Sequence, residues 1–305
     1  MKTIGLYPRF QVDVAPVSAI GHAGGVLLTE TIRATGLDRA LSGVLSPWRK
    51  PFAVHDPGKV ILDLAVSLAI GGDALSDIAT LRAEPGVHGQ VASDPTVSRI
   101  IGTLAADADR VLAAIDGARQ VARETAWALA AEHGPIVDAS PEAPVVIDLD
   151  ATLLTAHSEK EHAKPTWKKG YGFHPLTAFV DHGPAGTGEM LAIQLRPGNA
   201  GSNTAADHIA VTRTALAQLP GGKSRPGKSV LIRTDCAGGT HDYLTWLHKQ
   251  RVSYSVGFTL PHETPDLYRL IPETFWQSAL DADGQARDGA HVAEFTGVLD
   301  LAGWP

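Results

Sequence analysis

The feature of this sequence that most constrains its fold is a change of hydrophobic period at Val145. Upstream, residues 55–133 place apolar side chains at helical spacing, and three prolines between 135 and 144 mark a linker. Downstream, short apolar runs typical of strands alternate with helical segments. The chain has 305 residues and is 44% hydrophobic, enough for more than one buried core. We therefore expect a helical part followed by an α/β part.

The helical part contains recognisable helix starts. Asp56 is expected to cap a helix that begins at Pro57 and ends at Gly71-Gly72. Residues 74–81 fit a second helix, Ser93-Asp94-Pro95-Thr96 opens a third, and residues 109–132 fit a fourth, rich in alanine. Residues 1–50 give a mixed pattern, in which residues 10–14 alternate like an edge strand.

The α/β part has a definite order of elements. The expected strands are 145–150, 173–180, 190–195, 229–234 and 252–259, and the expected helices are 204–219 and 239–250. Short connections make the first three strands antiparallel, whereas crossover helices make the later ones parallel. This is the order of a ribonuclease H-like mixed sheet. We expect three parts: a helical domain at 1–140 with possible DNA binding, an incomplete catalytic core at 145–259, and the start of a β-rich insertion at 260–305.

Two aspartates stand at strand ends that such a sheet brings together. Asp150 lies near the end of the first strand and Asp235 at the end of the fourth, and these strands are neighbours in that topology. An aspartate at one strand end is ordinarily a cap or turn residue, but two on adjacent strands form a pair. Paired carboxylates supply the oxygen ligands that hard divalent cations require. Two such ions about 3.5–4 Å apart can promote cleavage of a phosphodiester.

Several motifs resemble one protein family in their order and spacing. They are His55-Asp56-Pro57-Gly58-Lys59, Gly71-Gly72-Asp73-Ala74-Leu75-Ser76-Asp77, Ser93-Asp94-Pro95-Thr96-Val97-Ser98-Arg99, Asp148-Leu149-Asp150-Ala151-Thr152-Leu153, Lys168-Lys169-Gly170-Tyr171-Gly172-Phe173-His174-Pro175-Leu176, Leu195-Arg196-Pro197-Gly198-Asn199-Ala200-Gly201-Ser202-Asn203-Thr204 and Arg233-Thr234-Asp235-Cys236-Ala237-Gly238-Gly239-Thr240. Together they resemble insertion-sequence DDE transposases, in the group typified by insertion sequence 1380 within the insertion sequence 4-like superfamily. The resemblance covers nearly the whole chain.

The resemblance implies metal-dependent DNA cleavage and strand transfer, with Mg²⁺ or Mn²⁺ in a two-metal site. It gives Asp150 the role of first catalytic aspartate and Asp235 that of second. Asp148 lies on the same strand face as Asp150, so it is a rival for the first role or a further metal ligand. The family's catalytic glutamate follows a strand-rich insertion, and we expect the printed chain to be truncated before it and inactive.

The resemblance also implies double-stranded DNA as partner, both terminal inverted repeats and target, and a possible homodimer in the complete enzyme. The net charge of −7 is concentrated at residues 260–305, which hold eight acidic and two basic residues. The candidate DNA-binding residues are Lys164, Lys168, Lys169, Tyr171, Arg196 and Arg99. Residues 96–104, which carry Arg99, fit a DNA-reading helix and a packing helix equally well, and the lysine cluster also fits a solvated hairpin tip.

Two other functions fit parts of the sequence. Asp148 and Asp150 after an apolar strand resemble the first motif of haloacid dehalogenase-like phosphatases, with Asp148 as nucleophile and Asp150 as general acid. A non-catalytic DNA-binding remnant of a transposase is the other alternative. Asp281-Ala282-Asp283-Gly284 fits a hairpin turn better than a calcium loop, because the remaining ligand positions fail.

Cysteine content and the amino-terminal sequence bear on localisation. The single cysteine, Cys236, excludes an internal disulfide, and the amino-terminal residues have no apolar run like that of a signal peptide. The most apolar stretch, residues 60–70, is interrupted by Asp63 and is too short to span a bilayer. We therefore expect a cytoplasmic protein without a membrane partner.

Overall fold

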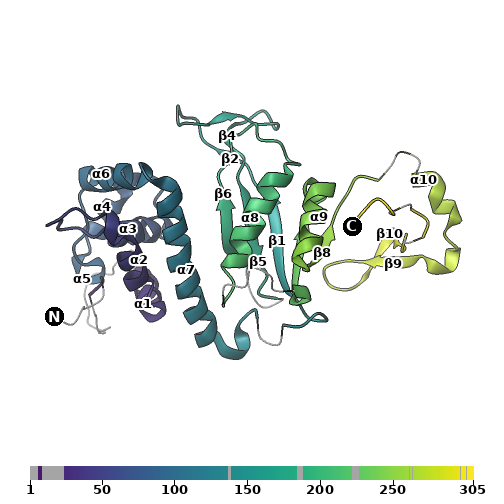
Figure 1. Cartoon of the computed structure of the whole chain (residues 1–305), viewed down its shortest axis with the longest axis horizontal. Coiled ribbons are helices and arrows are strands. Elements are labelled where there is room, and N and C mark those ends of the chain that lie inside the picture. Colours follow the sequence, from purple (N-terminus) through teal and green to yellow (C-terminus); the bar gives the residue numbers. More distant parts are fainter. Residues whose placement is uncertain are drawn as a thin grey trace. The chain divides into compact units, whose positions relative to one another are not determined.

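The computed structural model describes residues 6–8, 24–136, 139–183, 188–221, 227–260, 262, 264–295, 297–299 and 301–305. The chain divides into two compact units, one of residues 1–137 with 216–224 and one of residues 138–215 with 225–305 (Figure 1). The edge strand expected at residues 10–14 lies outside the described residues. The expected functional division into 1–140, 145–259 and 260–305 stays a prediction.

The first unit is helical in its described part. Its α-helices are α1 (Gly25–Thr35), α2 (Leu37–Leu45), α3 (Pro57–Ala69), α4 (Ile78–Arg82), α5 (Pro85–His88), α6 (Asp94–Ala105) and α7 (Ala108–Ala130), with 3-10 turns η1 (Ser46–Trp48), η2 (Leu75–Asp77) and η3 (Ala131–His133). The Asp56 carboxylate accepts hydrogen bonds from the backbone N–H groups of Gly58, at 2.8 Å, and Lys59, at 3.3 Å. The cap predicted for α3 is therefore confirmed.

Two parts of the helical prediction need correction. Residues 24–45, expected to be mixed, form α1 and α2, which are separated by Gly36 at a positive φ of 71°. Residues 74–81, expected to be one helix, form η2 followed by α4. The break has a local cause, because the Asp77 carboxylate accepts hydrogen bonds from the N–H groups of Asp73 and Ala74 and holds a tight turn there.

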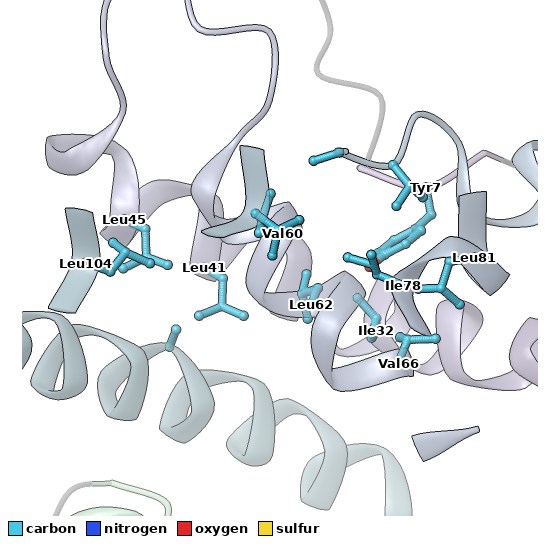
Figure 2. Close-up of a cluster of buried hydrophobic side chains, with 14 of the residues drawn as sticks. Tyr7, Ile32, Leu41, Leu45, Val60, Leu62, Val66, Ile78, Leu81 and Leu104 are labelled. Carbon is cyan, nitrogen blue, oxygen red and sulfur yellow. The ribbon is translucent and has the colours of Figure 1, made fainter. Parts of the chain in front are cut away.

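The core of the first unit joins several helices. Figure 2 shows Leu41 and Leu45 of α2 beside Val60 of α3, with Leu104 of α6 next to Leu45. Leu45 is fully buried, and each large apolar side chain buried in this way contributes roughly 1.5–3 kcal/mol. This core packs the end of α2 against α3 and α6. It therefore fixes both ends of the segment that connects α2 to α3.

The second unit is built on a mixed five-stranded sheet. Its strands are β1 (Val145–Ala151), β5 (Leu176–Val180), β6 (Glu189–Gln194), β7 (Val230–Thr234) and β8 (Ser253–Val256), in the order β6-β5-β1-β7-β8. β1, β5 and β6 are antiparallel neighbours, whereas β1, β7 and β8 are parallel. The helices α8 (Ala205–Ala217) and α9 (His241–Gln250) precede β7 and β8 (Figure 1). The predicted mixed α/β sheet is confirmed, and its order is compatible with a ribonuclease H-like fold.

A second, small sheet lies outside the expected elements. It contains β2 (Leu154–Thr155), β4 (Tyr171–Phe173) and β3 (Lys164–Pro165), in that order. The run at 173–180, predicted as one strand, is divided between β4 and β5 at His174 and Pro175. Proline has no N–H to donate to a sheet, which accounts for the interruption at this point.

The segment from residue 260 onward has short elements. They are α10 (Thr264–Leu267), η6 (Tyr268–Leu270), η7 (Glu273–Phe275) and the hairpin of β9 (Gln277–Leu280) with β10 (Ala286–Val292). Asp281 accepts hydrogen bonds from the N–H groups of Asp283 and Gln285, and Gly284 has a φ of 75°, so the predicted hairpin turn is confirmed. None of the helices in the described ranges is long and apolar enough to cross a membrane.

Candidate active site

The two aspartates singled out in the sequence lie at the same edge of the five-stranded sheet. Strands β1 and β7 run parallel, with Leu149 in register with Thr234. Asp150, still within β1, and Asp235, the residue after the end of β7, come next along the chain, so both follow the same rung of the ladder. Because the carboxyl ends of parallel strands meet at one edge, the structure brings these two carboxylates to one place.

Backbone hydrogen bonds hold one oxygen of each carboxylate. Oδ1 of Asp150 accepts from the N–H of Ala151 at 2.8 Å, and Oδ1 of Asp235 accepts from the N–H of Ala237 at 2.9 Å. The second bond caps the 3-10 turn η5 (Cys236–Gly238). A Cβ on Gly238 would lie 2.3 Å from Cγ2 of Thr234, so only glycine fits where this turn folds back onto β7. In each carboxylate Oδ2 has no hydrogen-bond partner among the described residues.

Both aspartates line a cavity of about 490 Å³ within the second unit. Its wall comes from the ends of β1 and β7, from the start of β5, from α8 and from two loops. The lining residues are Leu149, Asp150, Ala151, Trp167, His174, Leu176, Ala200, Gly201, Ser202, His208, Thr234, Asp235 and Ala237. Asp148 is not among them.

Two buried histidines in this wall were missed by sequence reasoning. Nδ1 of His208 lies 3.0 Å from the carbonyl oxygen of Thr204, and Nδ1 of His174 lies 3.3 Å from that of Ala200. A carbonyl only accepts, so Nδ1 of each ring is the donor, and in the neutral form of the ring Nε2 is the acceptor. Burial lowers the pKa of His208, which keeps its ring neutral at neutral pH. The only sequence feature that could have indicated this contact is the position of His208 four residues after Thr204, at the start of a predicted helix.

Arg196 has partners other than the DNA phosphate that we expected. Its side chain is only 3% exposed, and it forms an ion pair with Asp207 at 3.1 Å. Its guanidinium also donates to the carbonyl oxygens of His174, at 3.0 Å, and Gly201, at 3.2 Å. These bonds tie the start of α8 to both loops of the cavity wall, so in this structure Arg196 braces the wall.

The hairpin between β3 and β4 reaches the cavity through Trp167. This side chain is 71% exposed, and Nζ of Lys168 lies 4.9 Å from the centre of its ring. The backbone of the hairpin approaches the loop after β6 closely, because a Cβ on Gly198 would lie 2.2 Å from the carbonyl oxygen of Lys164. Sequence reasoning chose the neighbouring lysines but missed Trp167.

The other expected DNA-binding residues lie in two places. Lys164, Lys168 and Lys169 are exposed on or beside this hairpin, and Tyr171 is half-buried in β4, where it stacks on His157 at 6.1 Å. Arg99 is exposed on α6 in the first unit, where it donates to the hydroxyl of Thr96 at 2.9 Å.

Asp148 lies on the same face of β1 as Asp150 but has a different environment. Arg233, its register partner on β7, donates to both of its carboxylate oxygens at 2.6 Å. The same guanidinium donates to Asp181 at 3.1 Å. The structure therefore brings Asp150 and Asp235 together at the cavity and places Asp148 in a separate ion-pair network.

The donor set of the cavity suits a hard divalent cation. Asp150 and Asp235 each present a free carboxylate oxygen, and oxygen donors are what Mg²⁺ and Mn²⁺ prefer. In the part of the chain that the structure describes, no group of three or more His, Cys, Asp or Glu side chains is arranged to hold a metal ion. The two aspartates thus fit the expected ion, without a third acidic ligand at this place among the described residues.

Comparison with known proteins identifies the family. No curated protein matches this chain. The family described as transposase DDE domain, group 1, matches residues 5–304, which is nearly all of the chain and includes both aspartates of the cavity. The chain therefore belongs to the DDE transposase family, group 1.

Proposed function

We propose that Asp150 and Asp235 are catalytic carboxylates of this transposase and that they hold Mg²⁺ or Mn²⁺ at the cavity. One observation carries the proposal: the two residues follow a single rung of the parallel ladder between β1 and β7 and line the same cavity. The family assignment supports transposition as the activity, and hydrolysis or transfer of a phosphodiester is the chemistry that such a carboxylate pair serves.

Several residues in and beside the cavity have a part in the proposed reaction. A bound divalent ion supplies Lewis-acid stabilisation of charge on the phosphodiester. The N–H groups of Ala151 and Ala237 fix the two carboxylates through Oδ1 and leave Oδ2 of each to hold a divalent ion. His208 and His174 present acceptor nitrogens to a water molecule or a DNA hydroxyl that enters the cavity. Arg196 keeps the loop and the start of α8 in place around them.

We further propose that the hairpin between β3 and β4 guides DNA into the cavity. Lys164, Lys168 and Lys169 are exposed cations that suit backbone phosphates, which are bound without regard to sequence. Trp167 offers a flat apolar surface at the cavity wall, on which a nucleobase can stack. Tyr171 contributes from β4, where its ring is partly covered.

The finer assignments rest on the sequence resemblance. Membership of the group typified by insertion sequence 1380, action at terminal inverted repeats, and a homodimer remain predictions. The phosphatase alternative is not favoured, because its nucleophile would be Asp148, whose carboxylate is engaged by Arg233 and does not line the cavity. We assign the third carboxylate to no residue.

The proposal is tested by DNA cleavage with the protein expressed from its complete reading frame. Nicking is measured in Mn²⁺ on a duplex that carries the ends of the element next to the gene. We expect Asp150→Asn and Asp235→Asn each to abolish nicking while leaving DNA binding and thermal unfolding close to those of the wild type. Asp181→Asn, a matched change away from the cavity, serves as control. Nicking that persists in both cavity variants would overturn the proposal.

A further inference from the structure

The turn between α2 and α3 in the first unit holds a phenylalanine entirely in solvent. Phe52 is fully exposed, at 103% of its reference area, and Val54 two residues later is 71% exposed. Removing a large apolar side chain from water is favourable. Two such side chains held outward on one short turn therefore indicate a surface that another molecule covers.

The turn is braced, which keeps Phe52 in this position. The N–H of Ala53 donates to the carbonyl oxygen of Lys50 at 3.1 Å, which places Phe52 at the third position of a tight turn with a φ of 60°. This conformation favours glycine, so a phenylalanine here is strained. Arg49 holds the base of the turn by donating to the carbonyl oxygen of Ala53 and to the carboxylate of Asp56. Strained residues that their surroundings hold in place cluster at functional sites, including ligand clamps.

Three cationic side chains, Arg49, Lys50 and Arg99, line a cavity of about 290 Å³ beside this turn. Its wall is formed by η1, the turn itself, the start of α3 and one face of α6, and it consists of Trp48, Arg49, Lys50, Ala53, Val54, His55, Pro57, Thr96, Arg99, Ile100, Thr103 and Leu104. No acidic residue is among them, although the whole chain carries a net charge of −7. Lys50 and Arg99 are exposed and have no acidic partner among the described residues. The cavity therefore suits an anionic ligand.

An exposed aromatic residue on a turn beside a cavity that is lined by free cations suits duplex DNA, the substrate class of a DNA transposase, as the ligand. Proteins that bend duplex DNA insert an apolar side chain between base pairs and bind the flanking phosphates with cations. We propose that the turn of residues 50–54 inserts Phe52 into duplex DNA, while Lys50 and Arg99 bind the adjacent phosphates. This inference rests on the proposed function only in taking DNA as the partner. It gives α6 a DNA contact, through Arg99, whereas the sequence fitted a DNA-reading helix and a packing helix equally well.

The test measures DNA binding and base unstacking without divalent metal, so that it is independent of cleavage. The probes are the full chain and a set of short duplexes with the fluorescent base 2-aminopurine at each position in turn. We expect the wild type to bind with a salt-dependent affinity and to raise 2-aminopurine fluorescence at one region. Phe52→Ala should remove this fluorescence rise and weaken binding about tenfold. Lys50→Glu with Arg99→Glu should weaken binding further and lower its salt dependence.

Matched controls separate this role from general effects. Phe275→Ala removes another exposed phenylalanine, and Arg39→Glu reverses an exposed charge on α2 that lies outside the cavity wall. The inference is overturned if the wild type does not bind DNA, if Phe52→Ala keeps the fluorescence rise, or if the charge variants weaken binding no more than Arg39→Glu. A change from dimer to monomer on Phe52→Ala, with DNA binding intact, would instead identify the turn as a contact between two copies. Loss of cleavage in Asp235→Asn is a separate result that none of these outcomes changes.

Discussion

Asp148 and Arg233 face each other in register on β1 and β7, and the guanidinium donates to both carboxylate oxygens at 2.6 Å. The hydrogen bonds that Arg233 donates to Asp148 raise the pKa of the guanidinium, which stays charged. Asp148 lies two residues before Asp150, and Arg233 lies two residues before Asp235. An acidic residue next to the candidate active site is thus already neutralised by a neighbour.

We expect Asp148→Asn to leave metal-dependent DNA cleavage within a few-fold of the wild type, in contrast to Asp150→Asn. Both side chains of the pair are more than a third exposed, at 40% and 45%, so its contribution to the free energy of unfolding is about 1 kcal/mol or less. Arg233→Gln should therefore lower the free energy of unfolding in urea by a similarly small amount. If Asp148→Asn abolished cleavage as completely as Asp150→Asn, Asp148 would be a metal ligand and the separation of the two aspartates would be wrong.

The second prediction concerns acid stability and Asp77. Hydrogen bonds from the N–H groups of Ala74 and Asp73 hold the pKa of this carboxyl below its usual range. A depressed pKa stabilises the folded state above the ordinary aspartate value of about 3.9, and that stability is lost as pH falls through the folded pKa. We therefore expect Asp77→Asn to lower the urea midpoint at pH 7, and the difference from the wild type to shrink below about pH 4.

The control for Asp77 is Glu132→Gln, which removes a charge from a side chain that is 84% exposed. This variant should follow the wild type across the whole pH range. A difference between Asp77→Asn and the wild type that stayed constant down to pH 2 would show that the turn loses its geometry rather than its charge, and the linkage argument would fail.

The fold was predictable where the information is local. The cap at Asp56 and the start of α6 depend on residues within one turn of the helix, and both follow the sequence pattern. Helices α1 and α2 were not predicted, because their buried faces include Thr29 and Asp38. Oδ2 of Asp38 accepts a hydrogen bond from the N–H of Leu6, 32 residues earlier, a partner that hydrophobic spacing does not reveal.

The candidate site was predictable only in its two aspartates. The strand pattern locates Asp150 and Asp235, since each follows an apolar run and the order of elements makes these strands neighbours. The partners of Arg196 and Asp148 are unpredictable in this way, because they depend on side-chain packing between elements 11 and 85 positions apart. From sequence alone, an arginine in a motif, such as Arg196, is therefore more readily predicted to bind phosphate than to form a buried ion pair that supports the cavity wall.

The last prediction separates the two ring nitrogens of His208. Nδ1 lies against the carbonyl oxygen of Thr204, and the ring packs against that of Tyr243, tilted by 51° with 5.3 Å between centres, whereas Nε2 has no partner among the described residues. Asparagine places its amide near the position of Nδ1, and glutamine places its amide near that of Nε2. We expect His208→Asn to retain the contact with Thr204 and fold normally, but to lose most DNA cleavage, because the cavity has lost an acceptor. His208→Gln should retain more cleavage, although its thermal unfolding midpoint falls further. The measurements are cleavage rate and unfolding midpoint for both variants. Cleavage that follows stability, highest in the asparagine variant, would show that His208 only supports the helix.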